Sequence, residues 1–298
     1  MYNPRYPSTS SFLPVQGLKL HLRHWSRPNK PKLLLLHGWM DASASFQFLV
    51  DHLPPEWDIY ALDWRGFGLS EHQAFGYYDR SHMLIDLHLV RQHLCPNDEP
   101  IHIVGHSLGG MLASMYVGAL PETCRSLTIA EGFGVPNGDL NKAHIRLRHY
   151  IEEHATLQPY PAPTTLADLA RKQQQRNPLL GDAEALFVAD ALAHTNADGQ
   201  LVYRADKKHK HTTPMPYHYA HAQALWQQIS CPTLLLYGDT VPHNHYLNAI
   251  KDSLAERLAS YPNAHSLQLA GAGHMLQWEA PQAFADALAT FLRQHEAA

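Results

Sequence analysis

The sequence predicts an α/β protein: a mostly parallel central sheet flanked by helices, with a helical cap inserted after the sixth strand. Three observations support this prediction. Short continuous apolar runs recur along the chain, and amphipathic stretches lie between them. A third feature is the stretch 132–228, which contains no comparable apolar run. Alternation of apolar strands with helices is typical of a parallel sheet that is covered on both faces.

Each predicted strand is a short apolar run that could be buried on both sides. These runs are residues 33–38, 57–64, 101–106, 126–131, 233–238 and 266–271. The predicted helices cover 79–94, 108–120, 245–258 and 281–292. Ligands of such sheets bind beyond the carboxyl ends of the strands. The residues directly after each strand are therefore the first candidates for chemistry.

The stretch 132–228 is too long to be a bare loop between two strands of a compact domain. Its apolar residues show helical periods, which predicts a largely helical cap over the carboxyl edge of the sheet. The predicted organisation is a core formed by residues 1–131 and 229–298, with the cap over 132–228 between its two parts.

Composition excludes several classes of protein. Of 298 residues, 45% are hydrophobic and 17% are charged, which excludes a disordered chain. Lys and Arg number 23 against 27 Asp and Glu, a formal net charge of −4. A mildly acidic chain without a dominant basic block is poorly suited to bind a phosphate backbone, so we expect no nucleic-acid partner.

Cysteine usage and the apolar runs predict a cytoplasmic protein. Cys95, Cys124 and Cys231 are odd in number, widely spaced and without a CxxC pair, which favours reduced thiols. The first residues contain no apolar core behind a basic start, as a secretory signal would. The longest apolar run, 33–36, is far too short to span a bilayer, so no membrane insertion is expected. The sequence leaves the oligomeric state open.

A nucleophile motif follows the predicted strand over 101–106. Residues 105–109 read Gly-His-Ser-Leu-Gly, the G-x-S-x-G pattern between a strand and a helix. So sharp a turn strains the backbone of the serine and leaves little space around it. The positions two residues before and two residues after the serine must therefore lack side chains, and they are Gly105 and Gly109. Ser107 would stand at the N-terminus of the next helix, where the helix dipole favours developing negative charge. The motif predicts Ser107 as a catalytic nucleophile.

A neutral hydroxyl is a weak nucleophile and needs a base. In this strand–turn–helix arrangement the chain order is serine, then acid, then histidine. The sequence has 23 histidines, but His274 is the one that stands in a glycine-rich loop after the last predicted strand. We therefore predict His274 as the base.

Backbone N–H groups are the usual stabilisers of the oxyanion that forms during acyl transfer. Leu108, directly after the nucleophile, is the predicted source of one such group. The second is predicted from Trp39, in the loop after the strand over 33–38. Gly38 allows the close turn there, and Gly38 and His106 are predicted to border the substrate.

Several motifs together resemble the α/β-hydrolase family. They are HGW at 37–39, DWRGFGLS at 63–70, GHSLGG at 105–110, and GAGH at 271–274 followed by a helix that begins with proline. The resemblance extends from about residue 17 to about residue 292. HGWMDASASF and DGQLVYRAD are most similar to serine hydrolase-like proteins and related carboxylesterases. Haloalkane dehalogenases and epoxide hydrolases share the fold and cap, but they use an aspartate where this chain has Ser107.

The acid departs from the commonest pattern of that family. Most relatives place an aspartate three residues past the glycine that ends the next-to-last strand, and this position is Val241 here. Glu131, at the end of the sixth strand, and Asp239, one residue past Gly238, are the two candidates. A carboxylate at the end of an apolar strand is unfavourable without a partner. His274 would supply that partner, so we favour Glu131 and keep Asp239 as the alternative.

The resemblance implies a serine hydrolase that cleaves a small carboxylic ester through an acyl-enzyme, without a metal or an organic cofactor. One alternative is a binding protein on the same scaffold that has lost turnover, since Val241 occupies the usual acid position. Another is the same triad used for other acyl transfer or for C–C hydrolysis. The cap histidines have spacings that can bind zinc but lack accompanying ligands, so we predict no metal site there. They are His209, His211, His218 and His221.

Overall fold

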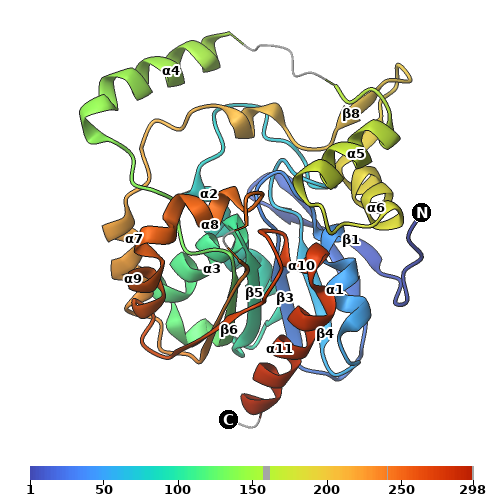
Figure 1. The fold of residues 1–298 in the computed structure, drawn as a ribbon, viewed down its shortest axis with the longest axis vertical. Helices are drawn as coiled ribbons and strands as arrows, with labels where there is room; N and C mark the ends of the chain where they lie inside the picture. Colours follow the sequence, from blue (N-terminus) through green and yellow to red (C-terminus); the bar gives the residue numbers. More distant parts are fainter. Residues whose placement is uncertain (157–161, 240, 297–298) are drawn as a thin grey trace.

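The computed structural model describes residues 1–156, 162–239 and 241–296. Its centre is an eight-stranded sheet with the order β1-β2-β4-β3-β5-β6-β9-β10 (Figure 1). In chain order the strands are β1 Thr9–Val15, β2 Leu18–Trp25, β3 Lys32–Leu36, β4 Asp58–Leu62, β5 Ile101–His106, β6 Cys124–Ala130, β9 Thr233–Tyr237 and β10 Ala264–Gln268. Within this sheet, only the pairs β1–β2 and β2–β4 are antiparallel. The predicted mostly parallel sheet is confirmed.

Alternate residues of the central strands point to opposite faces, as strand geometry requires. Leu34 and Leu36 of β3 belong to one apolar cluster, with α2 (Arg80–Leu94), α3 (Leu108–Ala119) and α7 (Tyr219–Trp226). Leu33 and Leu35 belong to a second cluster, with α1 (Gln47–His52) and α11 (Pro281–Gln294). Helices therefore cover both faces of the sheet (Figure 1).

The N-terminal hairpin β1–β2 carries no long apolar run, so it is absent from the strands predicted above. β1 is mostly exposed and lies at the edge of the sheet. Gln16 and Gly17 join the two strands with φ values of 47° and 79°. Positive φ at both positions is the signature of a tight two-residue hairpin turn.

Two predicted elements differ most from the structure. β10 covers Ala264–Gln268, whereas the sequence predicts a strand over 266–271, because Gly271 has φ 79° and turns the chain. The predicted helix over 245–258 is divided into α8 (His245–Ile250) and α9 (Leu254–Ala259) by a 3-10 turn. At this break Ser253 Oγ donates to the carbonyl of Ile250 at 3.1 Å, which is how serine competes with regular helical bonding.

The segment between β6 and β9 contains α4 (Ala143–Ala155), α5 (Leu166–Arg176), α6 (Asp182–Leu192) and α7. It also contains a short hairpin, β7 (Ala193–Thr195) with β8 (Leu201–Tyr203), which helical periodicity does not predict. α7 packs on α3, where the Trp226 indole donates to Ser114 Oγ at 3.0 Å. Leu169 and Ala170 of α5 join a third apolar cluster with Phe48 and Trp278 of the sheet-bearing part.

The remaining helix, α10 (Leu276–Glu279), connects the loop after β10 to α11. None of the helices in the described ranges is both long enough and apolar enough to cross a bilayer.

Candidate active site

Ser107 stands between the last residue of β5 and the first residue of α3. Its backbone has φ 51° and ψ −116°, a left-handed conformation that side chains rarely adopt. A Cβ on Gly105 would approach the carbonyl oxygen of Gly109 to 2.5 Å, and one on Gly109 would approach that of Leu36 to 2.1 Å. The turn can therefore form only with glycine at both positions, as the motif predicts.

His274 contacts both Ser107 and Glu131. Its Nε2 lies 3.1 Å from Ser107 Oγ, and its Nδ1 lies 3.2 Å from Glu131 Oε2. A carboxylate can only accept, so Nδ1 carries the proton when Glu131 is ionised. Nε2 is then free to accept the proton of the serine hydroxyl. The ring of Tyr246 packs against the imidazole with a centroid distance of 4.8 Å.

Glu131 lies directly after β6 and is fully buried. Its backbone has φ 53°, a second left-handed position at a strand end. The Gly238 N–H donates to Glu131 Oε1 at 2.7 Å, and the Asn244 amide lies 3.4 Å from each carboxylate oxygen. The Gly238 N–H and the Asn244 amide thus stabilise the buried carboxylate in addition to His274.

Asn244 and Gly238 are site residues that the sequence reasoning above does not find. Asn244 is fully buried, and its Oδ1 accepts from the N–H of Leu247 at 3.0 Å at the start of α8. An asparagine directly before a helical pattern is a recognisable N-cap signal. That signal predicts the N-cap of α8. It does not predict the contact with Glu131, which depends on how β6 and β9 pair.

Asp239 does not contact His274. One of its carboxylate oxygens accepts from the Gln268 amide and the other from the Gly271 N–H. It therefore holds the turn after β10. Of the two acid candidates, the structure brings Glu131, and not Asp239, to the imidazole.

His106, predicted to border the substrate, is fully buried beneath the His274 loop. Its Nε2 donates to the carbonyl of His274 at 2.9 Å, and its Nδ1 lies 3.3 Å from Gln277 Nε2. Burial holds the pKa of His106 well below its usual value, so the ring is neutral. These contacts fix the loop that carries His274.

Gly38 and Trp39 follow β3, next to the nucleophile. A Cβ on Gly38 would lie 3.2 Å from Ser107 Cβ, so Gly38 allows the two strand ends to approach closely. The Trp39 side chain is half exposed, and its indole donates to the carbonyl of His209 at 3.2 Å. Leu108 is the first residue of α3, and the first N–H groups of a helix have no partner within that helix.

Burial dominates the electrostatics of the site. It lowers the pKa of His274 to about 4, so the imidazole is neutral at neutral pH. It raises the pKa of Glu131 to about 8, although the Gly238 N–H and Asn244 amide act in the opposite direction. Asp41, also buried, has a pKa raised to about 7, and this shift is opposed by the Ser45 hydroxyl.

A cavity of about 510 Å³ lies beside His274. Its lining comes from three parts of the chain: Trp39, Met40 and Asp41 after β3; Gln173, Arg176, Asn177, Leu192, Tyr203, Ala205 and Lys210 from the segment between β6 and β9; and His243, His245, Tyr246, His274, Met275 and Trp278 from the C-terminal part. Such a volume suits a small organic molecule.

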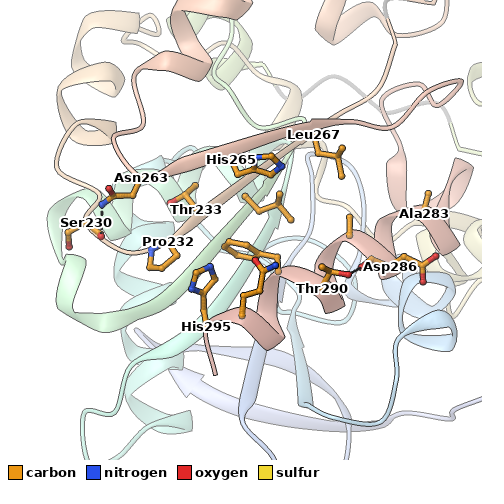
Figure 2. A pocket seen from close by; sticks show the side chains of 14 residues that line it. Ser230, Pro232, Thr233, Asn263, His265, Leu267, Ala283, Asp286, Thr290 and His295 are labelled. Atoms are coloured by element: carbon orange, nitrogen blue, oxygen red, sulfur yellow. Dashed lines mark hydrogen bonds between the residues drawn. The ribbon is translucent and has the colours of Figure 1, made fainter. Parts of the chain in front are cut away.

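A larger cavity, of about 1080 Å³, lies among β9, β10 and α11 (Figure 2). Its lining includes His265, Leu267, Asp286 and Thr290 but neither Ser107 nor His274. The volume of a cavity therefore does not identify the candidate active site in this protein. The arrangement of the titratable side chains identifies it.

The cap histidines do not form a metal cluster in the described ranges, where no three His, Cys, Asp or Glu side chains are placed to hold an ion. His209 instead lies between the rings of Phe67 and Tyr78, at centroid distances of 3.7 and 3.6 Å. His211 packs edge-on against His154 at 4.8 Å. Aromatic packing accounts for both rings.

Known proteins resemble this chain in both sequence and fold. The sequence pattern of the Alpha/beta hydrolase family matches residues 33–287. A serine hydrolase-like protein of Danio rerio is 27% identical over 200 residues, which cover 65% of this chain and 60% of that protein. A monoacylglycerol lipase of Xenopus laevis is 30% identical over 101 residues, 34% of this chain and 30% of that protein. The chain thus spans less than two thirds of the length of each of these two relatives.

Solved structures resemble the fold over nearly all of the chain. A thioesterase domain from the curacin biosynthetic pathway has a TM-score of 0.84 at 23% identity, covering 95% of this chain and 99% of that domain. E-2-(acetamidomethylene)succinate hydrolase has a TM-score of 0.75 at 20% identity, with coverages of 96% and 100%. At these identities the likeness concerns the architecture alone.

Proposed function

The chain belongs to the alpha/beta hydrolase family, and on that premise we propose that it is a serine hydrolase that cleaves carboxylic esters through an acyl-enzyme. One observation carries the proposal: His274 lies 3.1 Å from Ser107 Oγ and 3.2 Å from Glu131 Oε2. A nucleophile, a base and a carboxylate that orients the base are the groups that acyl transfer requires.

In the first half-reaction, Ser107 Oγ attacks the ester carbonyl carbon while its proton moves to His274 Nε2. The resulting oxyanion is stabilised by the backbone N–H groups of Leu108 and Trp39. The intermediate collapses, the C–O bond to the alcohol breaks, and His274 returns the proton to the leaving oxygen. The products are an alcohol and an ester on Ser107.

In the second half-reaction, water attacks the acyl-enzyme and gives its proton to His274. Collapse of this intermediate releases the carboxylic acid and restores the Ser107 hydroxyl with the proton from His274. Glu131 stabilises the imidazolium in both halves and holds the proton on Nδ1, so that Nε2 faces the serine.

We further propose that residues 132–228 act as the cap that selects the substrate. Seven residues of this segment, among them Arg176 and Tyr203, line the cavity beside His274. The substrate would then lie between the cap and the carboxyl ends of the strands.

The experiment that tests the proposal is labelling with a fluorophosphonate probe. An activated serine attacks the phosphorus, whereas an unactivated hydroxyl does not. We expect stoichiometric labelling at Ser107, located by peptide mass spectrometry, and its loss in His274→Ala. An unlabelled native protein would instead favour a binding protein without turnover.

The pH profile provides a further prediction. When Glu131 is protonated it donates to His274 Nδ1, which leaves the proton of the neutral ring on Nε2, facing the serine. That tautomer cannot accept the serine proton. Because burial raises the pKa of Glu131 to about 8, kcat/KM is expected to rise with pH through an inflection near 8.

The measurement is kcat/KM for a p-nitrophenyl ester between pH 5 and 10, corrected for spontaneous hydrolysis. Glu131→Gln should lack the inflection near pH 8, since glutamine does not titrate. A wild-type profile that is flat from pH 6 to 10 would contradict this assignment.

A further inference from the structure

Building on the proposed function, we propose that the ester taken by this site carries a carboxylate, which Arg176 binds in the cavity beside His274. The substrate class would then be half-esters of dicarboxylic acids or other acidic esters. The observations that carry this inference concern the charge of the cavity wall and the guanidinium of Arg176, which has no partner among the described residues.

The cavity wall carries two cationic side chains, Arg176 and Lys210, and one carboxyl group, Asp41. Asp41 is 3% exposed, and its carboxyl accepts from Ser45 Oγ at 2.7 Å. Burial raises its pKa to about 7, so its negative charge is partly absent at neutral pH. The wall is therefore net positive, and a cavity with low-dielectric walls concentrates ligands of the opposite charge.

Arg176 is the last residue of α5, and its exposed guanidinium has no hydrogen bond, ion pair or ring contact with any residue in the described ranges. Arg171, on the same helix, instead pairs with Asp168 at 2.9 Å. α5 is anchored to the core through Leu169 and Ala170. A guanidinium on a fixed helix at a cavity wall, without a protein partner, is suited to bind a carboxylate with two parallel hydrogen bonds.

Lys210 follows His209, whose side chain has contacts with three residues outside its turn. The His209 imidazole lies between Phe67 and Tyr78 and donates through Nε2 to the carbonyl of Arg65 at 3.0 Å. The carbonyl of His209 accepts from the Trp39 indole, and Trp39 also lines the cavity. The chain that carries Lys210 is thus fixed to the loop beside the nucleophile.

A carboxylate fits these groups better than a phosphate dianion does. Arg176 stands at the C-terminus of α5, where the helix dipole contributes partial negative charge. No helix N-terminus of eight residues or longer contributes to the wall, as phosphate sites commonly require.

The test compares two p-nitrophenyl esters of similar length, mono-p-nitrophenyl succinate and p-nitrophenyl valerate. We expect wild-type kcat/KM to be about tenfold higher for the acidic ester, mainly through KM, the size of one partly solvated charge-assisted interaction. This preference should decrease as salt is raised from 0.05 to 0.5 M. Arg176→Gln is expected to lower the acidic-to-neutral ratio by about fivefold or more.

Arg171→Gln is the matched control, because Arg171 lies on the same helix but outside the cavity lining. It should keep the wild-type ratio. Hydrolysis of both esters at equal kcat/KM, or an unchanged ratio in Arg176→Gln, would overturn the inference while the serine hydrolase mechanism stands. Failure to hydrolyse either ester, together with absent fluorophosphonate labelling of Ser107, would overturn the mechanism itself and the inference with it.

Discussion

Replacing Ser107 with alanine is expected to reduce kcat for a p-nitrophenyl ester by about 10⁴-fold or more. The hydroxyl oxygen forms the acyl bond in the proposed mechanism, and alanine has no group that could replace it. Alanine and serine both carry a Cβ, so the left-handed backbone at position 107 is equally demanding for either residue. Folding should therefore be preserved.

The measurement is steady-state hydrolysis, with thermal unfolding followed by circular dichroism to establish that the variant is folded. Ser81→Ala is a suitable control, since Ser81 is exposed on α2 and does not line the cavity. It should retain wild-type activity. A folded Ser107→Ala protein that hydrolyses the ester at the wild-type rate would eliminate Ser107 as nucleophile.

The second large effect is expected from the acid. Glu131→Gln preserves the shape of the side chain but removes the negative charge that stabilises the imidazolium and fixes its tautomer. We expect kcat to fall by about 10³- to 10⁴-fold. The fall should be accompanied by loss of the inflection near pH 8, which a purely structural role would not affect.

Asp239→Asn is the matched comparison, because both residues follow neighbouring strands and both were candidates for the acid. Its carboxylate bonds to Gln268 and Gly271, and not to His274. We expect its kcat to stay within about threefold of wild type, since only a supporting turn is altered. A large loss of kcat in Asp239→Asn together with a small loss in Glu131→Gln would assign the role of the acid to Asp239.

Much of the site was predictable because its signals are local in sequence. Ser107 lies in a motif whose glycines are required by the geometry of the turn. His274 lies in a glycine-rich loop after the last strand, and Glu131 ends a strand in a position where a carboxylate needs a partner. The inferences about Ser107 and His274 needed only the neighbouring residues and the order of strands along the chain, whereas the choice of Glu131 also used the resemblance to the α/β-hydrolase family.

Other features depend on contacts between distant segments, so the sequence could not reveal them. The Asn244 amide lies near Glu131 only because α8 begins next to the end of β6. His106 appears beside the nucleophile in sequence, yet its ring is directed beneath the His274 loop by Gln277. The β7–β8 hairpin is too short for a strand pattern to emerge, and the position of Arg176 is determined by the packing of α5.

The contacts of His274 with Ser107 and Glu131 span 167 and 143 residues of chain. Strands β5, β6 and β9 and the loop beyond β10 must all be assembled before the three side chains can meet. A collapsed intermediate with intact helices but an unfinished sheet would be inert. Catalytic turnover should therefore report global topology, and the denaturant midpoint measured by activity is expected to occur no later than the one measured by helical ellipticity.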